Sequence, residues 1–326
     1  MAVLVVGDAN ADLSARLRRF PQEGGDSPVE ALGWGSGGAA VNVAAALAAL
    51  GTPARLLVRV GPDPAADVAL AAARQAGVDL SAVQRDEELA TGLCYAAISP
   101  GGERTFLSYR GANVNLDMPN GGLPADTRWL HVCGHALLEG RQRRTALELI
   151  GAAHERGLPV SLDACLPLIE ARQAELGGLA RQLDVLFINE PELATLAGLP
   201  SLGSGAGASP EALHAALAAA ADLLPPAVAV KLGARGCAVI GAEGTLRLPA
   251  FAVDALDTTG CGDAFAAGFI HATLRGAGRE PAALLANALG ALVATRPGAA
   301  SALPSRAEMR AFLADRAPDL LPLVVP

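Results

Sequence analysis

The stretch DALDTTGCGDAFAAGF, residues 254–269, places a glycine-rich turn directly before an apolar run that predicts a helix. Glycine lets the backbone approach a ligand without a Cβ in the way, and a helix N-terminus carries partial positive charge. The backbone of Gly260, Cys261 and Gly262 therefore suits an anion such as phosphate. Asp263 would repel that phosphate, unless it faces a hydroxyl that must lose its proton to attack the phosphate. The alternative is that Asp263 only caps the helix.

Short apolar runs alternate with alanine-rich stretches along the chain, which predicts an α/β protein. The expected strands are residues 3–6, 56–60, 129–132, 160–162, 185–188 and 228–232, and the expected helices are residues 41–50, 65–76, 141–156 and 211–224. Buried strands that alternate with helices indicate a mostly parallel sheet with helices on both faces. Ligands of such sheets bind beyond the carboxyl ends of the strands, where a glycine-rich turn is useful.

Two segments depart from this alternation. Residues 11–35 contain turn formers but no clear helix, and residues 91–110 resemble a hairpin with a Pro-Gly-Gly turn. We expect these two excursions to form a small β lid that closes over the ligand, within a single domain of residues 1–326. Exposed strand edges in such a lid invite pairing with another subunit, so a homodimer through the lid is expected. Residues 203–210, GSGAGASP, are expected to form a flexible surface loop.

Composition restricts the partners and the compartment. The 326 residues carry a net charge of −8 without a long basic run, which disfavours nucleic acid. The N-terminus has no basic segment of a signal peptide, and no apolar run reaches the length of ~18 residues that a membrane span needs. Five widely spaced cysteines are typical of free thiols in a reducing compartment. We therefore predict a cytoplasmic protein that binds neither nucleic acid nor membrane.

Five stretches resemble the ribokinase-like (phosphofructokinase-B-type) carbohydrate kinases. DTTGCGDAFAAGF is similar to their C-terminal signature D-T-T-G-A-G-D-x-F-x-x-G, with Cys261 at the usual alanine. GSGGAAVNVAAALAALG, residues 35–51, is similar to their N-terminal signature. NEPE (189–192), VKLGARG (230–236) and RPGAASALPSR (296–306) also match. The matches follow the family's order and span nearly the whole chain.

The resemblance implies an ATP-dependent kinase in which Asp263 is the catalytic base and residues 260–262 form the anion hole. It further implies roles for residues at four other sites. Sugar hydroxyls would be bound by Asp12, Gly38 and Asn42; the nucleotide by Asn189, Lys231, Gly233, Gly236 and Asn287; Mg²⁺, mostly through water, by Asn189 and Glu192; and a monovalent cation, usually K⁺, by Asp257, Thr259 and the backbone near Gly298.

Simpler interpretations exist for several of these residues. Asp12 could cap a local turn, Glu192 could complement a helix dipole, and Asn287 could satisfy a contact between helices. Lys231 is harder to explain structurally, because it lies in an apolar strand and unpaired buried lysines are rare.

The substrate is predicted to be an unphosphorylated sugar. Family members that act on sugar phosphates tend to carry a basic residue within the Gly-Gly signature, where this chain has Ala39 and Ala40. Arg110 could meet a carboxylate, as in the 2-keto-3-deoxygluconate branch, but SLDACLP (161–167) lacks that branch's second arginine. Arg110 is therefore interpreted as a lid surface residue or a hydroxyl contact. A nucleoside and a sugar acid remain alternative substrates.

Two further function classes fit the sequence less well. An NAD-dependent oxidoreductase needs G-x-G-x-x-G after the first strand, and this chain has GDANAD there. A ligand-binding protein without catalysis is disfavoured by the intact glycines and Asp263. Finally, the position of Cys261 at a helix N-terminus predicts a lowered thiol pKa, with an inert thiol as the alternative.

Overall fold

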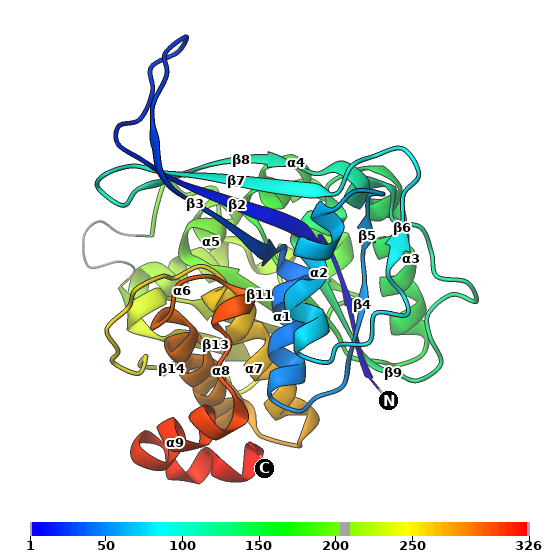
Figure 1. Ribbon diagram of the computed structural model, residues 1–326. Coiled ribbons are helices and arrows are strands. Elements are labelled where there is room, and N and C mark those ends of the chain that lie inside the picture. The colour runs from blue at the N-terminus through cyan, green and yellow to red at the C-terminus, as the bar shows by residue number, and fades with distance from the viewer. Residues whose placement is uncertain (1, 203–208, 325–326) are drawn as a thin grey trace.

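The computed structural model describes residues 2–202 and 209–324, and its largest element is an eight-stranded sheet (Figure 1). Residues 203–208 of the expected surface loop lie outside the described part. The strands lie in the order β14-β13-β12-β11-β10-β9-β1-β4. Their bounds are β1 Ala2–Val6, β4 Ala54–Leu57, β9 Thr127–Cys133, β10 Val160–Asp163, β11 Val185–Asn189, β12 Ala227–Lys231, β13 Cys237–Gly241 and β14 Gly244–Leu248. All neighbours from β4 to β12 pair in parallel, and β13 and β14 are antiparallel, so the predicted fold class is confirmed.

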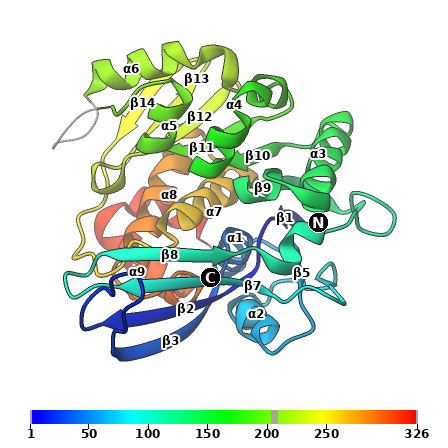
Figure 2. The same cartoon turned by 90° about the horizontal axis from the view of Figure 1, so that it is seen from above.

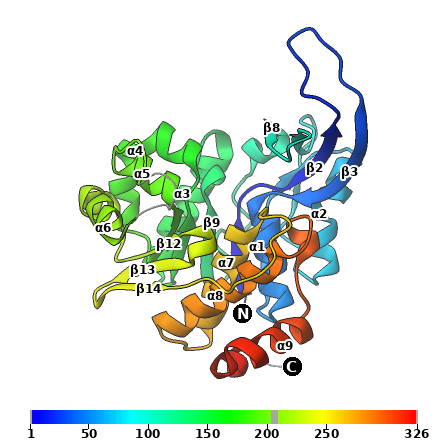
Figure 3. The same cartoon turned by 90° about the vertical axis from the view of Figure 1, so that its left-hand side faces the viewer.

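Helices cover both faces of this sheet (Figure 3). One face carries α1 (Ala39–Ala49), α7 (Cys261–Leu274) and α8 (Arg279–Ala294), with α2 (Ala65–Gln75) and α9 (Arg306–Arg316) beside them; the other carries α3 (Gly140–Glu155), α4 (Leu166–Ala180), α5 (Glu190–Leu196) and α6 (Pro210–Ala219). Successive residues of β1 contribute to opposite cores: Val3 and Val5 to the first, Leu4 and Val6 to the second. This alternation follows from the two-residue period of a strand.

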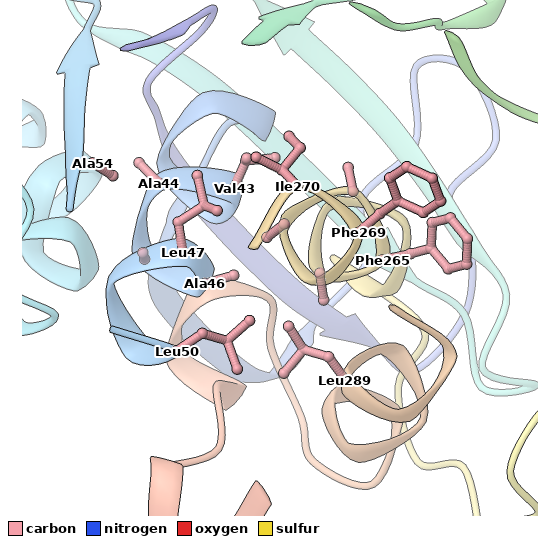
Figure 4. Close-up of a cluster of buried hydrophobic side chains, with 14 of the residues drawn as sticks. Val43, Ala44, Ala46, Leu47, Leu50, Ala54, Phe265, Phe269, Ile270 and Leu289 are labelled. Atoms are coloured by element: carbon pink, nitrogen blue, oxygen red, sulfur yellow. The ribbon is translucent and has the colours of Figure 1, made fainter. Parts of the chain in front are cut away.

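Helix α7 is fixed in the first core (Figure 4). The ring of Phe187 in β11 meets Phe265 and Phe269 of α7 edge to face, with centroids 6.2 and 5.5 Å apart. A Cβ added at Gly268 would lie 2.9 Å from the Cα of Ala286, so α7 and α8 pack closely. These contacts fix the position of α7, so that its N-terminus lies at the edge of the large sheet.

The predicted small β lid is a four-stranded sheet in the order β3-β2-β7-β8 (Figure 2). Its strands are β2 (Asn10–Leu17), β3 (Val29–Gly37), β7 (Gly92–Ile98) and β8 (Arg104–Tyr109). Arg16, Ile98 and Arg104 share one row of the sheet, and Arg104 contacts the loop before α7. We call this side the inner face. Trp34 and Leu107 share another row, which is an odd number of residues along each strand from the row of Arg104. Because successive side chains of a strand point to opposite faces, they lie on the outer face.

Two expected elements differ from the structure by more than two residues at one end. The expected strand 56–60 is divided, because after Leu57 the chain leaves the large sheet and Arg59–Val60 (β5) pairs with Gln84–Arg85 (β6). The expected helix 211–224 ends at Ala219, and a short 3-10 turn follows at Ala221–Leu223. Among the described helices, none has the length and apolar character needed to cross a membrane.

Candidate active site

Polar side chains end five neighbouring strands at one edge of the large sheet. Asp8 and His135 lie just beyond β1 and β9, and Asp163, Asn189 and Lys231 are the last residues of β10, β11 and β12. The N-terminus of α7 lies at the same edge, because Lys231 contacts its first turn. This is the edge where ligands of parallel α/β sheets bind.

The glycine-rich loop adopts a conformation that only glycine suits. Gly260 has a φ of +76°, and a Cβ added there would lie 2.7 Å from the Cβ of Ala299. Helix α7 begins at the next residue, Cys261. A Cβ added at Gly262 would lie 3.2 Å from Lys231 Nζ, so the lysine ammonium lies against the loop. The loop therefore combines a helix N-terminus with a fixed cation, and both favour an anion.

Asp263, in the first turn of α7, accepts a hydrogen bond from Asn42 Nδ2 of α1 at 2.7 Å. Burial, with a contribution from the Asp163 carboxylate, raises the pKa of Asp263 to about 7, although Asn42 and Lys231 act in the opposite direction. A carboxylate with a pKa near neutrality is well matched to accept a proton from a hydroxyl.

The predicted sugar residues lie beside this carboxylate. Asn42 is 8% exposed, and its Oδ1 has no hydrogen-bond partner among the described residues; Oδ1 of Asp12 is likewise unpaired. Burial raises the pKa of Asp12 to about 6. Gly38, with a φ of +90°, brings the backbone against the carbonyl of Asp8, where a Cβ would lie 2.3 Å from the oxygen. Asn42 and Asp12 can thus offer acceptors to substrate hydroxyls.

Lys231 is paired with a residue that the sequence analysis did not select. Its Nζ donates to Asp163 Oδ1 at 2.6 Å. Burial alone would lower the pKa of Lys231, but the carboxylates of Asp163 and Glu192 outweigh it and raise the pKa. Lys231 is therefore a fixed positive charge that extends from the end of β12 to the glycine-rich loop.

Asn189 and Glu192 form a capping box at the start of α5. Glu192 N donates to Asn189 Oδ1 at 2.9 Å, and Asn189 N donates to Glu192 Oε2 at 2.8 Å. Burial raises the pKa of Glu192 to about 7. Glu192 therefore has a structural role at the start of a helix, as the simpler interpretation expects, because the capping box stabilises that start.

The residues predicted to hold a monovalent cation meet at one point. Asp257 Oδ1 accepts from Thr259 N at 2.8 Å, and Asp257 Oδ2 accepts from Gly298 N at 2.9 Å. The guanidinium of Arg104, from lid strand β8, also donates to Asp257 Oδ1 at 2.8 Å. Arg104 was not selected from the sequence.

Gly233 and Gly236, two of the residues predicted to bind the nucleotide, follow the end of β12, whereas Asn287 lies in α8. Gly233 and Gly236 have φ values of +60° and +91°, and a Cβ at Gly236 would lie 2.0 Å from Leu248 O. Asn287 of α8 donates from Nδ2 to Pro249 O at 3.1 Å. Asn287 therefore holds the chain that follows β14.

The interpretation of Arg110 as a lid surface residue is wrong. Its side chain is 17% exposed and donates to Asp8 Oδ1 at 3.0 Å, to His135 O at 2.8 Å and to Gln142 Oε1 at 2.5 Å. Its Nε is buried without a hydrogen-bond partner among the described residues. Arg110 thus belongs to the floor at the β1–β9 end of the site.

The predicted acidity of Cys261 is also wrong in direction. Burial, together with the carboxylates of Asp257 and Asp263, raises the pKa of the Cys261 thiol to about 11. Two nearby negative charges and loss of solvent outweigh the helix N-terminus, which would stabilise a thiolate.

Four residues of the site were missed: Asp8, Arg104, Gln142 and Asp163. Two of them carried a usable signal, since Asp8 and Asp163 follow apolar strands directly and parallel strands end at a common edge. Arg104 and Gln142 act across 153 and 134 residues of sequence, on Asp257 and Asp8. No local pattern marks such contacts.

Comparison with known proteins agrees with this geometry. The model of the pfkB family of carbohydrate kinases matches residues 2–306. The ATP-dependent ribose-1-phosphate kinase of Halopiger xanaduensis is 36% identical over 314 residues, which cover 96% of this chain and 98% of the relative.

Two solved structures are similar along almost their whole length. Arabidopsis thaliana ribokinase, complexed with ribose and ATP, has a TM-score of 0.80 and 26% identity over 96% of this chain and 99% of that one. A fructokinase double mutant from Vibrio cholerae, with fructose, ADP and potassium ion bound, has a TM-score of 0.74 and 28% identity over 96% and 98%. With its glycine-rich loop, the Asp263 carboxylate in the first turn of α7 and a family match over nearly its whole length, the chain belongs to the pfkB family of carbohydrate kinases and is an ATP-dependent sugar kinase.

Proposed function

We propose that this kinase transfers the γ-phosphoryl group of ATP to a hydroxyl of a small unphosphorylated sugar. The observation that carries the proposal is Asp263: a carboxylate with a pKa near 7, held by Asn42 at the mouth of a glycine-rich helix N-terminus. Asp263 takes the proton of the attacking hydroxyl. Asn42 keeps the carboxylate oriented, and its free Oδ1, with that of Asp12, accepts hydroxyls of the sugar.

The glycine-rich loop and Lys231 oppose the charge that develops on the transferred group. Backbone groups of residues 260–262 at the start of α7 and the adjacent ammonium are positioned before the reaction begins, which is the most effective form of electrostatic stabilisation. The glycine turn Gly233–Gly236 and Asn287 would flank the nucleotide on the β12 side of the loop.

The residues present fit a Mg²⁺ ion that is held chiefly by phosphates and water. The described residues contain no cluster of three or more His, Cys, Asp or Glu side chains able to enclose a metal, and Mg²⁺ usually binds through one or two carboxylates. Glu192, whose Oε2 alone is used in the capping box, would provide that carboxylate with Asn189 beside it. When bound, Mg²⁺ neutralises phosphate charge.

Charge pairing favours an uncharged sugar over a sugar phosphate. Arg110, the cation at the floor of the site, donates to Asp8 Oδ1 at 3.0 Å, so the positive charge there is already paired. Ribose-1-phosphate is the second candidate, because a relative with 36% identity is named for it and Arg110 Nε is unpaired. Nucleosides and sugar acids complete the set of acceptors to test.

A coupled ADP-release assay over ribose, deoxyribose, fructose, ribose-1-phosphate, adenosine and 2-keto-3-deoxygluconate tests the proposal. We expect the highest kcat/KM with a neutral sugar. Higher kcat/KM with ribose-1-phosphate, lost selectively in Arg110→Met, would assign Arg110 to a substrate phosphate and reject the neutral sugar. If ADP is released at the same rate with and without every one of these acceptors, the proposed transfer reaction is rejected.

We further propose a cytoplasmic homodimer that forms through the outer face of the lid. Leu32, Trp34, Leu107 and Tyr109 on this face are 50–64% exposed. Exposed apolar side chains that share one face of a sheet are typical of a protein interface, and the β3 and β8 edges of the lid are open. The free state of all five cysteines supports a reducing compartment.

A further inference from the structure

Arg104 connects the lid to the loop that leads into α7. It is the first residue of β8, and its Nη1 donates to Asp257 Oδ1 at 2.8 Å and to Thr259 Oγ1 at 2.5 Å. The side chains of Arg104 and Asp257 are 29% and 12% exposed, so the pair is largely shielded from water. A charge-assisted hydrogen bond in such surroundings is stronger than a bond at the open surface.

Asp257 is the point where three segments meet. Besides Arg104 from the lid, it accepts from Thr259 N of its own loop and from Gly298 N of the turn after α8. Both carboxylate oxygens therefore have partners, and the positive charge at this carboxylate is provided by the protein itself. The carboxylate lies only six residues before Asp263, on the loop that shapes the anion hole.

The surroundings leave room for the guanidinium to move. An open pocket of about 380 Å³ is lined by Gly102, Glu103 and Arg104 on the lid side and by residues 255–258 on the loop side. Arg104 follows a hairpin turn with Gly102 at a φ of +85°. The arginine could therefore withdraw from Asp257 without a change in the packed core.

We propose that Arg104 is the resident cation of Asp257, and that a free monovalent cation binds Asp257 only when Arg104 withdraws. Asp257, Thr259 and the backbone near Gly298 are the places at which the family resemblance implies such a cation. Two positive charges at one shielded carboxylate repel each other, so their occupancies exclude one another. Lid position and cation binding would then be coupled through a shared carboxylate. The inference goes beyond the proposed reaction and does not depend on the identity of the sugar.

The test measures K⁺ binding directly, without catalysis. The thermal unfolding midpoint is followed as KCl replaces choline chloride at constant ionic strength, for the wild type, Arg104→Ala and Arg104→Lys. Removal of the competing charge in Arg104→Ala should lower the half-saturating K⁺ concentration by roughly 3- to 10-fold. Arg104→Lys keeps the charge and should stay near the wild type. The K⁺ dependence is the readout, so any change in the K⁺-free midpoint does not affect it.

Arg16→Ala is the matched control, because Arg16 is an exposed arginine in the same row of the inner lid face. It should leave the K⁺ response unchanged. A response to K⁺ in Arg104→Ala but not in the wild type also supports the proposal, since Arg104 then excludes the ion fully. Equal half-saturating concentrations in the wild type and Arg104→Ala would overturn it, and so would a response in neither. Because no turnover is measured, a failed kinase assay and a failed competition remain distinguishable.

Discussion

As the proposed catalytic base, Asp263 must meet two requirements that oppose each other. It must be shielded from water so that its charge acts on the substrate, and it must lose its proton near neutral pH. Burial and the Asp163 carboxylate raise its pKa, whereas the Asn42 amide and the Lys231 ammonium lower it, and the balance is about 7. Burial and the polar neighbours together therefore set the pH range in which Asp263 loses its proton.

The pH dependence of kcat/KM follows from this balance. The base acts as a carboxylate, so activity rises as the pH increases and is half-maximal near pH 7. Asn42→Ala removes a hydrogen bond to the charged form, so the pKa rises and the ascending limb moves to higher pH by roughly one pH unit. Steady-state rates between pH 5.5 and 9 measure both curves.

The pH at which kcat/KM is half-maximal, rather than the maximal rate, is the relevant readout, because Asn42 is also proposed to bind the sugar. Asn115→Ala removes an amide that is bonded to Asp86, away from the glycine-rich loop, and should leave the limb in place. A wild-type profile that is flat from pH 6 to 8 would contradict this account of Asp263.

Cys261 is expected to react slowly with thiol reagents. With its pKa raised from 9.0 to about 11, its thiolate fraction at neutral pH is about 100-fold smaller than that of an unperturbed thiol. The wild type and Cys261→Ala should lose activity to iodoacetamide at the same rate, with or without ATP. Faster loss in the wild type that ATP prevents would show that the helix N-terminus outweighs burial.

At the scale of elements, the glycine-rich loop depends on close contact as well as on backbone freedom. Gly260 precedes α7 and Gly276 follows it, with nearly equal φ values of +76° and +79°. Around Gly276 nothing lies within 4 Å of an added Cβ, whereas at Gly260 the Cβ of Ala299 is 2.7 Å away. Substitutions at these two glycines can therefore distinguish the effect of backbone strain from that of steric overlap.

Alanine at each position tests this difference. Both variants lose about 1–2 kcal/mol of stability from the left-handed conformation. Gly260→Ala additionally displaces the loop against Ala299 and should reduce kcat by at least about 100-fold. Gly276→Ala should keep nearly wild-type kcat. Chemical denaturation measures the first effect and the kinase assay the second; equal kcat values in the two variants would mean that the loop tolerates the displacement.

The sequence was informative where a function needs a local pattern. The glycine-rich loop, the strand ends and Asn42 all lie in short signatures, and the structure gathers them at one edge of the sheet. The Arg104–Asp257 pair and the burial of Arg110 depend on where the lid lies, which no local pattern specifies. The Cys261 thiol was misjudged because its pKa depends on burial and on two nearby carboxylates, and the local sequence pattern shows neither.

At the scale of the whole molecule, the lid has two chemically different faces. Its inner face carries Arg104 toward the loop before α7, and its outer face exposes Trp34 and Leu107. A lid that closes over the sugar would exclude water, which competes as a phosphoryl acceptor. An outer face that pairs with a second copy would also hold the lid strands in register during closure.

The proposed dimer depends on this outer face. Leu107→Asp places a charge in the interface and should convert a particle of twice 32.8 kDa to a monomer. Phe106→Asp is the matched control, since Phe106 is 55% exposed on the same strand but lies on the inner face. Light scattering after size-exclusion chromatography gives both masses. A wild-type monomer, or a dimer that survives Leu107→Asp, would contradict the assignment.

The most direct test of the central claim is single-turnover phosphoryl transfer by Asp263→Asn, with the best sugar acceptor and saturating ATP. Asparagine keeps the shape of the side chain but cannot accept the hydroxyl proton. Because the loop backbone and Lys231 remain, ATP should bind with nearly wild-type affinity. The account predicts that the transfer rate falls by about 10²–10⁴-fold. A transfer rate within a few fold of the wild type would remove Asp263 from the reaction and contradict the account.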